Sequence, residues 1–261
     1  MEIGMKRQGS YYAIPVILNK QYDCDMLLDT GAWISVLQPF VAYDLGLEMT
    51  QAQSGQLSDG TEVAVPLTSG PVITVGCRQF QPNEVGIHPL PQHIPNVTAL
   101  AGVLGADFFR ELMILLDFPN EVLQIQYSDR SLQSTDRDKY TAPIILSPHG
   151  TLLLPVTLNE SVTLECEIDT GSRRTVFPQR LMPELELSAN SPNVRTRKVQ
   201  HYDQEYDQFE ATVDSIDLCE GIRIEKPIIR FQNTDFGFIG IDLLSSFRIW
   251  LNILDTTIAF L

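Results

Sequence analysis

Two aspartates occupy equivalent places in a repeated tripeptide, and they are the residues of this chain best suited to chemistry. Asp29 begins the run Asp-Thr-Gly-Ala, and Asp169, 140 positions later, begins Asp-Thr-Gly-Ser. Each aspartate follows an apolar or half-apolar stretch that reads as a strand. A single Asp-Thr-Gly is common by chance and is most often a plain turn. Two copies in repeated surroundings predict a pair of carboxyl groups that act together.

A symmetric pair of carboxyl groups has a defined acid–base chemistry. If two related halves pack about a pseudo-twofold axis that passes beside Asp29, then Asp169 lies across that axis and faces Asp29. Two carboxyl groups about 3 Å apart cannot both ionise cheaply, so they share one proton. The ionised group can take a proton from a bound water while the protonated group donates to a carbonyl oxygen. Such a pair can direct water onto an amide without a metal or a nucleophilic side chain.

The residues that follow each aspartate suit that task. Gly31 and Gly171 allow a sharp turn and leave room for backbone N–H groups near the carboxylates. Thr30 and Thr170 carry hydroxyls that can hydrogen-bond across the axis and lock the two loops together.

Ser172 is where the two turns differ, because the first copy has Ala32 at that place. The Ser172 hydroxyl can hydrogen-bond the neighbouring carboxylate and so favour its ionised form. We therefore expect Asp169 to carry the charge and Asp29 to hold the proton.

The repeat extends far beyond the two tripeptides and defines the elements that must position them. Three further pairs of segments match, at an offset of 140, at 139 and at 135: 12–19 with 152–159, 36–39 with 175–178, and 102–109 with 237–244. Short apolar runs separated by many turns predict a mostly-β chain. The repeat therefore predicts two similar domains, at 11–127 and 143–261, joined by a polar linker at 128–142.

Within each half, a glycine ends an apolar run and an aspartate follows it two residues later. Gly105 and Gly240 are expected where another backbone passes closely. Asp107 and Asp242 are expected to cap the short helices that follow these glycines.

The composition excludes several classes of function. The chain has 261 residues, 44% of them hydrophobic, and a formal net charge of −15, which argues against a nucleic-acid partner. No apolar run approaches the ~18–20 residues that a membrane span needs. The first ten residues lack an apolar signal core, so either the protein is cytosolic or an export signal has been removed. Four cysteines and four histidines show no metal-ligand spacing, so we expect free thiols, with one disulfide per half if the protein is exported, and no metal or other cofactor.

The two Asp-Thr-Gly-Ala/Ser turns, each followed by an apolar-apolar-Gly strand end, resemble the aspartic proteases of the pepsin and retropepsin group. The resemblance covers both halves. It implies a mostly-β fold of two pseudo-symmetric retropepsin-like (acid protease) lobes with a central cleft, in one chain that acts as a monomer. It assigns the catalytic role to Asp29 and Asp169, and a shared proton between the two acids is a known property of that family.

The resemblance also implies a flap, a β-hairpin that closes over the substrate. It falls at residues 55–65, with its tip at Ser58, Asp59 and Gly60. The corresponding segment of the second half, residues 199–207, has no glycine and many charges, so a single working flap is expected. Arg173 and Arg174 follow the second turn directly, and we interpret them as ion-paired structural residues rather than as cleft residues that favour acidic substrates.

Together these observations predict an endopeptidase that binds an extended peptide as an added strand. Its activity should follow a bell-shaped pH profile centred in mildly acidic pH. Two alternatives remain open from the sequence. One is a non-catalytic module that binds a peptide or protein on the same fold, and the other is a processing protease of narrow specificity.

Overall fold

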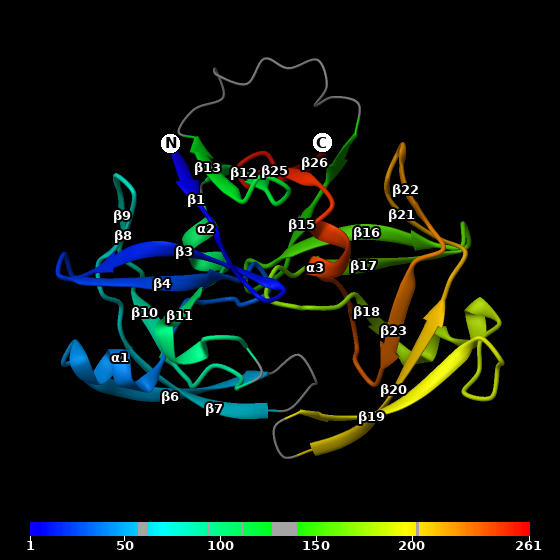
Figure 1. The fold of residues 1–261 in the computed structure, drawn as a ribbon, viewed down its shortest axis with the longest axis horizontal. Coiled ribbons are helices and arrows are strands. Elements are labelled where there is room, and N and C mark those ends of the chain that lie inside the picture. The colour runs from blue at the N-terminus through cyan, green and yellow to red at the C-terminus, as the bar shows by residue number, and fades with distance from the viewer. Residues whose placement is uncertain (57–61, 93, 111, 127–139, 202–203) are drawn as a thin grey trace.

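A computed structural model describes residues 1–56, 62–92, 94–110, 112–126, 140–201 and 204–261, and it consists mainly of strands (Figure 1). Each half contains one large sheet, and a third sheet is built from strands of both halves. In Figure 1 the two halves lie side by side, with the third sheet above them. No helix in the described ranges is long and apolar enough to cross a membrane.

The large sheet of the first half has the strand order β6-β7-β10-β5-β11-β4-β3-β8-β9, and β2 pairs with β3. Its strands are β2 (Lys6–Gln8), β3 (Tyr11–Leu18), β4 (Tyr22–Leu28), β5 (Val36–Leu37), β6 (Met49–Gln56), β7 (Glu62–Ser69), β8 (Ile73–Val75), β9 (Arg78–Phe80), β10 (Glu84–Ile87) and β11 (Leu100–Leu104).

The large sheet of the second half repeats this order strand for strand, as β19-β20-β23-β18-β24-β17-β16-β21-β22, and β15 pairs with β16. Its strands are β15 (Ile145–Leu146), β16 (Leu152–Leu158), β17 (Val162–Ile168), β18 (Val176–Pro178), β19 (Val194–His201), β20 (Gln204–Thr212), β21 (Ser215–Cys219), β22 (Ile222–Glu225), β23 (Ile228–Gln232) and β24 (Gly237–Ile239). The internal duplication seen in the sequence is therefore a duplication of structure.

The first hairpin of each half shows why the local sequence folds this way. Residues 19–21 join β3 to β4 and residues 159–161 join β16 to β17, and the first two residues of each connection have positive φ. Two successive residues with positive φ match the twist of the strands that the turn joins, and asparagine adopts this conformation readily. In both hairpins the second strand ends directly before an Asp-Thr-Gly turn.

The strand register corrects one detail of the sequence alignment. Val36 pairs with Val103, and Val176 pairs with Phe238, so Val36 and Val176 are equivalent at an offset of 140. The offset of 139 proposed for this segment is wrong. It rested on matching two prolines, but Pro39 begins a helix whereas Pro178 ends β18.

The third sheet joins the two halves in the order β1-β13-β12-β25-β26-β14. At its centre β12 pairs antiparallel with β25, with Leu115 opposite Trp250. The first two residues of β14 lie in the segment expected to be linker, and β1 precedes the expected start of the first lobe. Linker residues 128–139 lie outside the described ranges. These strands are β1 (Glu2–Gly4), β12 (Met113–Asp117), β13 (Val122–Gln126), β14 (Thr141–Pro143), β25 (Arg248–Asn252) and β26 (Thr257–Phe260).

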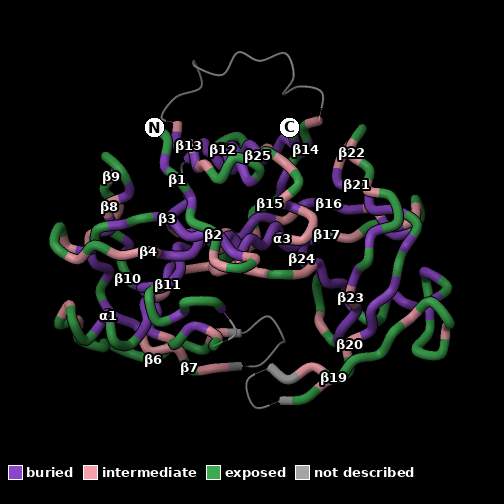
Figure 2. Tube along the Cα trace, viewed as in Figure 1, coloured by how far each residue is buried: buried purple, intermediate pink, exposed green. Residues whose placement is uncertain are grey.

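The described helices are short: α1 (Pro39–Asp44), α2 (Ala106–Phe109), α3 (Ile241–Leu244), and the 3₁₀ turns η1 (Val97–Ala99), η3 (Gln179–Leu181) and η4 (Pro183–Leu185). Buried residues concentrate where the three sheets meet (Figure 2). One hydrophobic cluster contains residues of both halves, including Leu28, Leu116, Ile168 and Leu251. The two halves therefore share a core, and this core supports the two turns that carry the aspartates.

Candidate active site

Each aspartate lies at the end of a buried strand. Leu28 is the last residue of β4 and Ile168 is the last of β17. The backbone N–H of Asp29 donates to the carbonyl of Leu104 at 3.0 Å, and that of Asp169 donates to the carbonyl of Ile239 at 3.0 Å. Because these carbonyls belong to the parallel neighbours β11 and β24, the sheets fix both turns at their first residue.

The turns hold the two carboxyl groups in the same way. Oδ1 of Asp29 accepts hydrogen bonds from the N–H groups of Gly31 (3.1 Å) and Ala32 (2.9 Å). Oδ1 of Asp169 accepts from the N–H groups of Gly171 and Ser172, both at 2.9 Å. Two backbone donors to one oxygen fix the orientation of each carboxyl group and favour its ionised form.

The two threonines interlock across the pseudo-twofold axis. The N–H of Thr30 donates to Oγ1 of Thr170 at 3.0 Å, and the N–H of Thr170 donates to Oγ1 of Thr30 at 3.1 Å. Each hydroxyl donates in turn to the carbonyl just before the opposite aspartate, Thr30 to Ile168 and Thr170 to Leu28. All of these groups are buried, so the turns of the two halves are joined by four hydrogen bonds in a dry environment.

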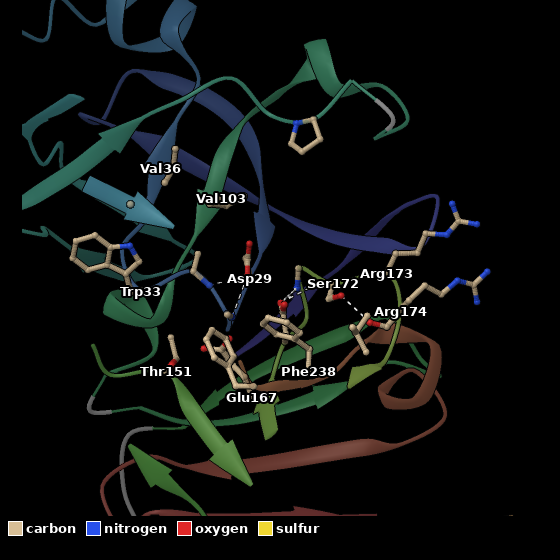
Figure 3. A pocket seen from close by; sticks show the side chains of 18 of the residues that line it. Asp29, Trp33, Val36, Val103, Thr151, Glu167, Ser172, Arg173, Arg174 and Phe238 are labelled. Atoms are coloured by element: carbon tan, nitrogen blue, oxygen red, sulfur yellow. Dashed lines mark hydrogen bonds between the residues drawn. The ribbon is translucent and has the colours of Figure 1, made fainter. Parts of the chain in front are cut away.

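The two glycines bring the carboxyl groups together. A Cβ atom on Gly31 would lie 2.6 Å from Cγ of Asp169, and one on Gly171 would overlap the carboxyl group of Asp29. Each carboxyl group therefore packs against the glycine of the opposite turn, which only a residue without a side chain permits. Asp29 and Asp169 also hydrogen-bond each other through their side chains. Figure 3 shows Asp29 within the pocket that the two halves form.

Burial raises the pKa of both aspartates, and the pKa of Asp169 is raised well above its usual range. For Asp169 the negative charges of Asp29 and of Glu167 act in the same direction as burial. These shifts favour the protonated form of Asp169, the opposite of the expectation that Asp169 carries the charge. That expectation relied on the Ser172 hydroxyl, which instead donates to the carbonyl of Arg174 at 2.8 Å.

A second symmetric pair of contacts supports the turns from behind. Ser35 Oγ donates to Asp107 Oδ1 at 2.8 Å and accepts from the N–H of Gly105 at 3.1 Å. Thr175 Oγ1 does the same with Asp242 (2.8 Å) and the N–H of Gly240 (3.1 Å). The sequence analysis missed both hydroxyls, although they lie at equivalent positions of the repeat.

These contacts give Asp107 and Asp242 a role different from the one that the sequence predicted. Asp107 and Asp242 lie inside the first turns of α2 and α3, and the N-cap residues are Gly105 and Gly240, so the predicted capping role is wrong. The close passage predicted at the glycines is confirmed. A Cβ atom on Gly105 would lie 2.5 Å from the carbonyl of Ile34, and one on Gly240 would lie 2.5 Å from that of Arg174.

A cavity of about 1250 Å³ opens over the two aspartates. It exceeds the ~300–1,000 Å³ of ordinary small-molecule pockets, so its size suits an extended polymer. Both halves line it, and each contributes a long hairpin, β6–β7 from the first half and β19–β20 from the second. The hairpin residues that line the cavity are Gln53, Ser54, Gly55, Val63 and Val65, and Arg197, Lys198, Val199, Tyr206 and Gln208.

The placement of the hairpins does not support the expectation of a single flap, because equivalent hairpins from both halves line the cavity. The predicted flap tip, Ser58, Asp59 and Gly60, lies outside the described residues. The charges of the second hairpin pair across its strands, with Lys198 opposite Asp207 and 3.0 Å from it. The charged sequence is therefore compatible with a regular hairpin.

The two arginines after the second turn differ in their surroundings. Arg174 lines the cavity, and its Nη1 lies 3.9 Å from Asp242 Oδ2, which agrees with a structural role. Arg173 is exposed, lines the cavity and forms no ion pair within the described ranges. All four cysteines are free, and no group of three or more potential metal ligands gathers among the described residues.

Glu167 is a cavity residue that the sequence analysis missed. Its side chain hydrogen-bonds Thr151, and burial raises its pKa to about 7. It occupies the position of an apolar residue of the first half, Leu27, and it shares its face of β17 with Glu165 and Thr163. A carboxyl group at an apolar position of the repeat was the signal that could have revealed it.

Comparison with known proteins agrees with this geometry. Residues 14–108, which include Asp29, Thr30 and Gly31, match a family described as aspartyl protease. The match supports the resemblance to aspartyl proteases of the retropepsin and pepsin type, and with it aspartic protease activity in general. A comparison with curated proteins returned no match.

Proposed function

We propose that this chain is an aspartic endopeptidase in which Asp29 and Asp169 share one proton and activate a water molecule. One observation carries the proposal. Each carboxyl group packs against the glycine of the opposite turn, which joins one acid from each half in a single buried site. The proposal includes an acid-protease fold of two pseudo-symmetric lobes, which the matching strand orders of the two large sheets support.

The proposed mechanism follows from the difference between the two aspartates. Asp29 is the ionised member and takes a proton from the attacking water, while protonated Asp169 donates its proton to the oxygen of the scissile carbonyl. The product of this step is a neutral tetrahedral gem-diol. Asp29 then gives its proton to the leaving amine nitrogen, and Asp169 recovers its proton as the carbonyl forms again. The proton count of the pair is therefore restored at the end of the cycle.

The proposed substrate is an extended polypeptide. The cavity runs between the two hairpins and the two Asp-Thr-Gly turns, so a strand-like peptide can lie along it with the scissile carbonyl over the aspartates. Backbone groups of the hairpins can pair with the peptide, and side chains then alternate between pockets of the two halves.

The test compares wild type with Asp29→Asn and Asp169→Asn on a diverse peptide library from pH 3 to 8. Each variant should keep its thermal unfolding profile and lose at least about 10²–10⁴ of kcat/KM, because one proton-transfer group is removed. Asp23→Asn removes an exposed carboxylate at the start of β4 and serves as the control. Inhibition by a statine-type transition-state mimic should accompany activity.

The alternatives give different results. A wild-type protein that binds peptides but cleaves none at any pH is a binding module, and this result would overturn the proposal. Cleavage confined to one protein sequence, and lost in both Asn variants, would retain the mechanism and identify a processing protease of narrow specificity.

A further inference from the structure

We propose that Glu167 makes one side of the cleft a subsite for a basic side chain, lysine or arginine, of the peptide substrate, whereas Leu27 makes the opposite side an apolar subsite. This inference rests on the proposed function and adds the class of substrate to it.

The two residues occupy equivalent positions on opposite sides of the dyad. Leu27 pairs with Val103 and lies two residues before Asp29, while Glu167 pairs with Phe238 and lies two residues before Asp169. Both line the cavity. In Figure 3 Val103 lies on one side of Asp29, and Glu167 lies on the other. A peptide across the aspartates therefore meets leucine on one side and glutamate on the other.

The side of Leu27 is apolar. Leu27 belongs to a buried hydrophobic cluster that also contains Tyr11, Leu90, Ile94 and Val103, and these residues line the cavity together. Such a wall favours an apolar side chain of the substrate, because apolar surface is removed from water when that side chain binds.

The carboxyl group of Glu167 has no cationic partner within the described residues. It is only 8% exposed, and its one described contact is the hydroxyl of Thr151. A buried carboxylate without a counter-charge is costly, and a cation that enters the site removes that cost.

Cavity cations nearby already have acidic partners. Arg230 and Arg197 both pair with Glu210, at 2.8 Å and 3.3 Å, and Lys198 pairs with Asp207. The exposed Arg173 lies on the other side of the dyad, near Tyr11, where its charge opposes the rise in the pKa of Tyr11 that burial causes. A substrate lysine or arginine is thus the natural partner for Glu167.

The wall beside Glu167 suits a long cationic side chain. Thr151 fixes the carboxyl group, and His149, two residues earlier, packs against Trp33 with ring centroids 5.5 Å apart. Trp33 and His149 line the same cavity. An indole face close to a carboxylate can hold the methylene stem and the charge of lysine or arginine together.

The competing reading treats Glu167 as a neutral structural acid. In that case the carboxyl group stays protonated, donates to Thr151 and has no preference for charge in the substrate. The two readings differ in one measurable quantity, the selectivity for a basic over an isosteric neutral side chain.

The test uses pairs of peptides that are identical except for lysine or norleucine at each position flanking the scissile bond. Wild type should cleave the lysine peptide with a kcat/KM on the order of tenfold higher at one of these positions, measured at pH 7. Glu167→Gln, of the same shape, and Glu167→Leu, the first-half residue, should reduce this ratio to about one. Asp23→Asn should keep the wild-type ratio, which excludes a general effect of net charge.

Equal cleavage of both peptides by wild type, or a lysine preference that persists in Glu167→Gln, would overturn the inference. The same peptides are also titrated by fluorescence anisotropy onto Asp29→Asn and onto Asp29→Asn/Glu167→Gln. If wild type cleaves nothing, the proposed function fails, and this binding assay still decides whether Glu167 selects a basic side chain.

Discussion

At the scale of single residues, Asp29 and Asp169 occupy almost identical turns, and a neighbour makes them different. Each carboxyl group accepts two backbone N–H bonds from its own turn. The charge of Glu167, however, acts on Asp169, whereas the first half has leucine at that place. Burial and the charge of Asp29 are the larger causes of the raised pKa of Asp169, and the charge of Glu167 adds to them.

The first prediction concerns the pH dependence of activity. The raised pKa values of both aspartates predict a bell-shaped profile of kcat/KM, with the alkaline limb where the shared proton is lost. Glu167→Gln removes a negative charge beside Asp169, so it should lower the pKa of the pair and move the alkaline limb to lower pH. Measured from pH 3 to 9, a profile that is flat between pH 4 and 8 contradicts the dyad, and an unmoved limb contradicts the role of Glu167.

The second prediction concerns stability and again uses Glu167. Its pKa rises from 4.5 to about 7 on folding, so the folded state binds more protons in this range. The free energy of unfolding should therefore fall by at most about 3 kcal/mol as pH rises from about 4.5 to 7. Above pH 7 this contribution should no longer change with pH. Urea denaturation at pH 4.5, 6 and 8 measures the slope, which should be smaller in Glu167→Gln. Equal slopes in wild type and Glu167→Gln would contradict a raised pKa of Glu167 in the folded protein.

The third prediction concerns the interlocked threonines. Thr30→Val removes a hydroxyl that accepts from Thr170 N–H and donates to the Ile168 carbonyl, and it leaves both partners buried without a bond. The expected loss is about 2–4 kcal/mol of unfolding free energy. Thr30→Ser keeps the hydroxyl and should lose much less. A valine variant as stable as the serine variant would show that these bonds do not hold the halves together.

At the scale of elements, the sequence indicated those features that depend on local chemistry. The doubled turns and the close passage at Gly105 and Gly240 follow from residue types that the backbone requires. The hairpin β19–β20 was underestimated because its many charges and its lack of glycine were taken as evidence against a second flap. Lys198 and Asp207 instead pair across its two strands. The predicted role of the Ser172 hydroxyl was wrong because the folded turn directs this hydroxyl to the carbonyl of Arg174.

The fourth prediction tests whether the second hairpin acts on the substrate. Lys198→Glu places a negative charge opposite Asp207 and at a position that lines the cavity. Because this pair is exposed, the unfolding free energy should hardly change, whereas KM should rise several-fold with a smaller effect on kcat. The exchange Lys198→Glu/Asp207→Lys restores the cross-strand pair and should recover most of the KM. Unchanged kinetics in the single variant would mean that only β6–β7 contacts the peptide.

At the scale of the whole molecule, the sequence indicated two related halves, but it did not indicate how they are joined. The third sheet pairs β12 with β25 across more than a hundred residues, and it recruits β1 and β14 from segments that read as an ordinary terminus and a linker. Such pairings depend on which edges remain free after each lobe has formed. No local sequence pattern indicates which strand edges remain free, so the shared sheet could not be predicted from the sequence.

The last prediction divides the chain within its linker into residues 1–126 and 140–261. Each fragment alone leaves one edge of its central strand, β12 or β25, without a partner. It also separates the buried apolar cluster of Met113, Leu115, Trp250 and Ala259 into two exposed halves. We expect each fragment to aggregate or to unfold, and the co-expressed pair to form a one-to-one complex that cleaves peptides. Light scattering and the peptide assay measure this, and Trp250→Asp, opposite Leu115, should prevent assembly. Activity of the first fragment alone would show instead that two copies of Asp29 can form the site, so that the difference between the halves refines catalysis without being required for it.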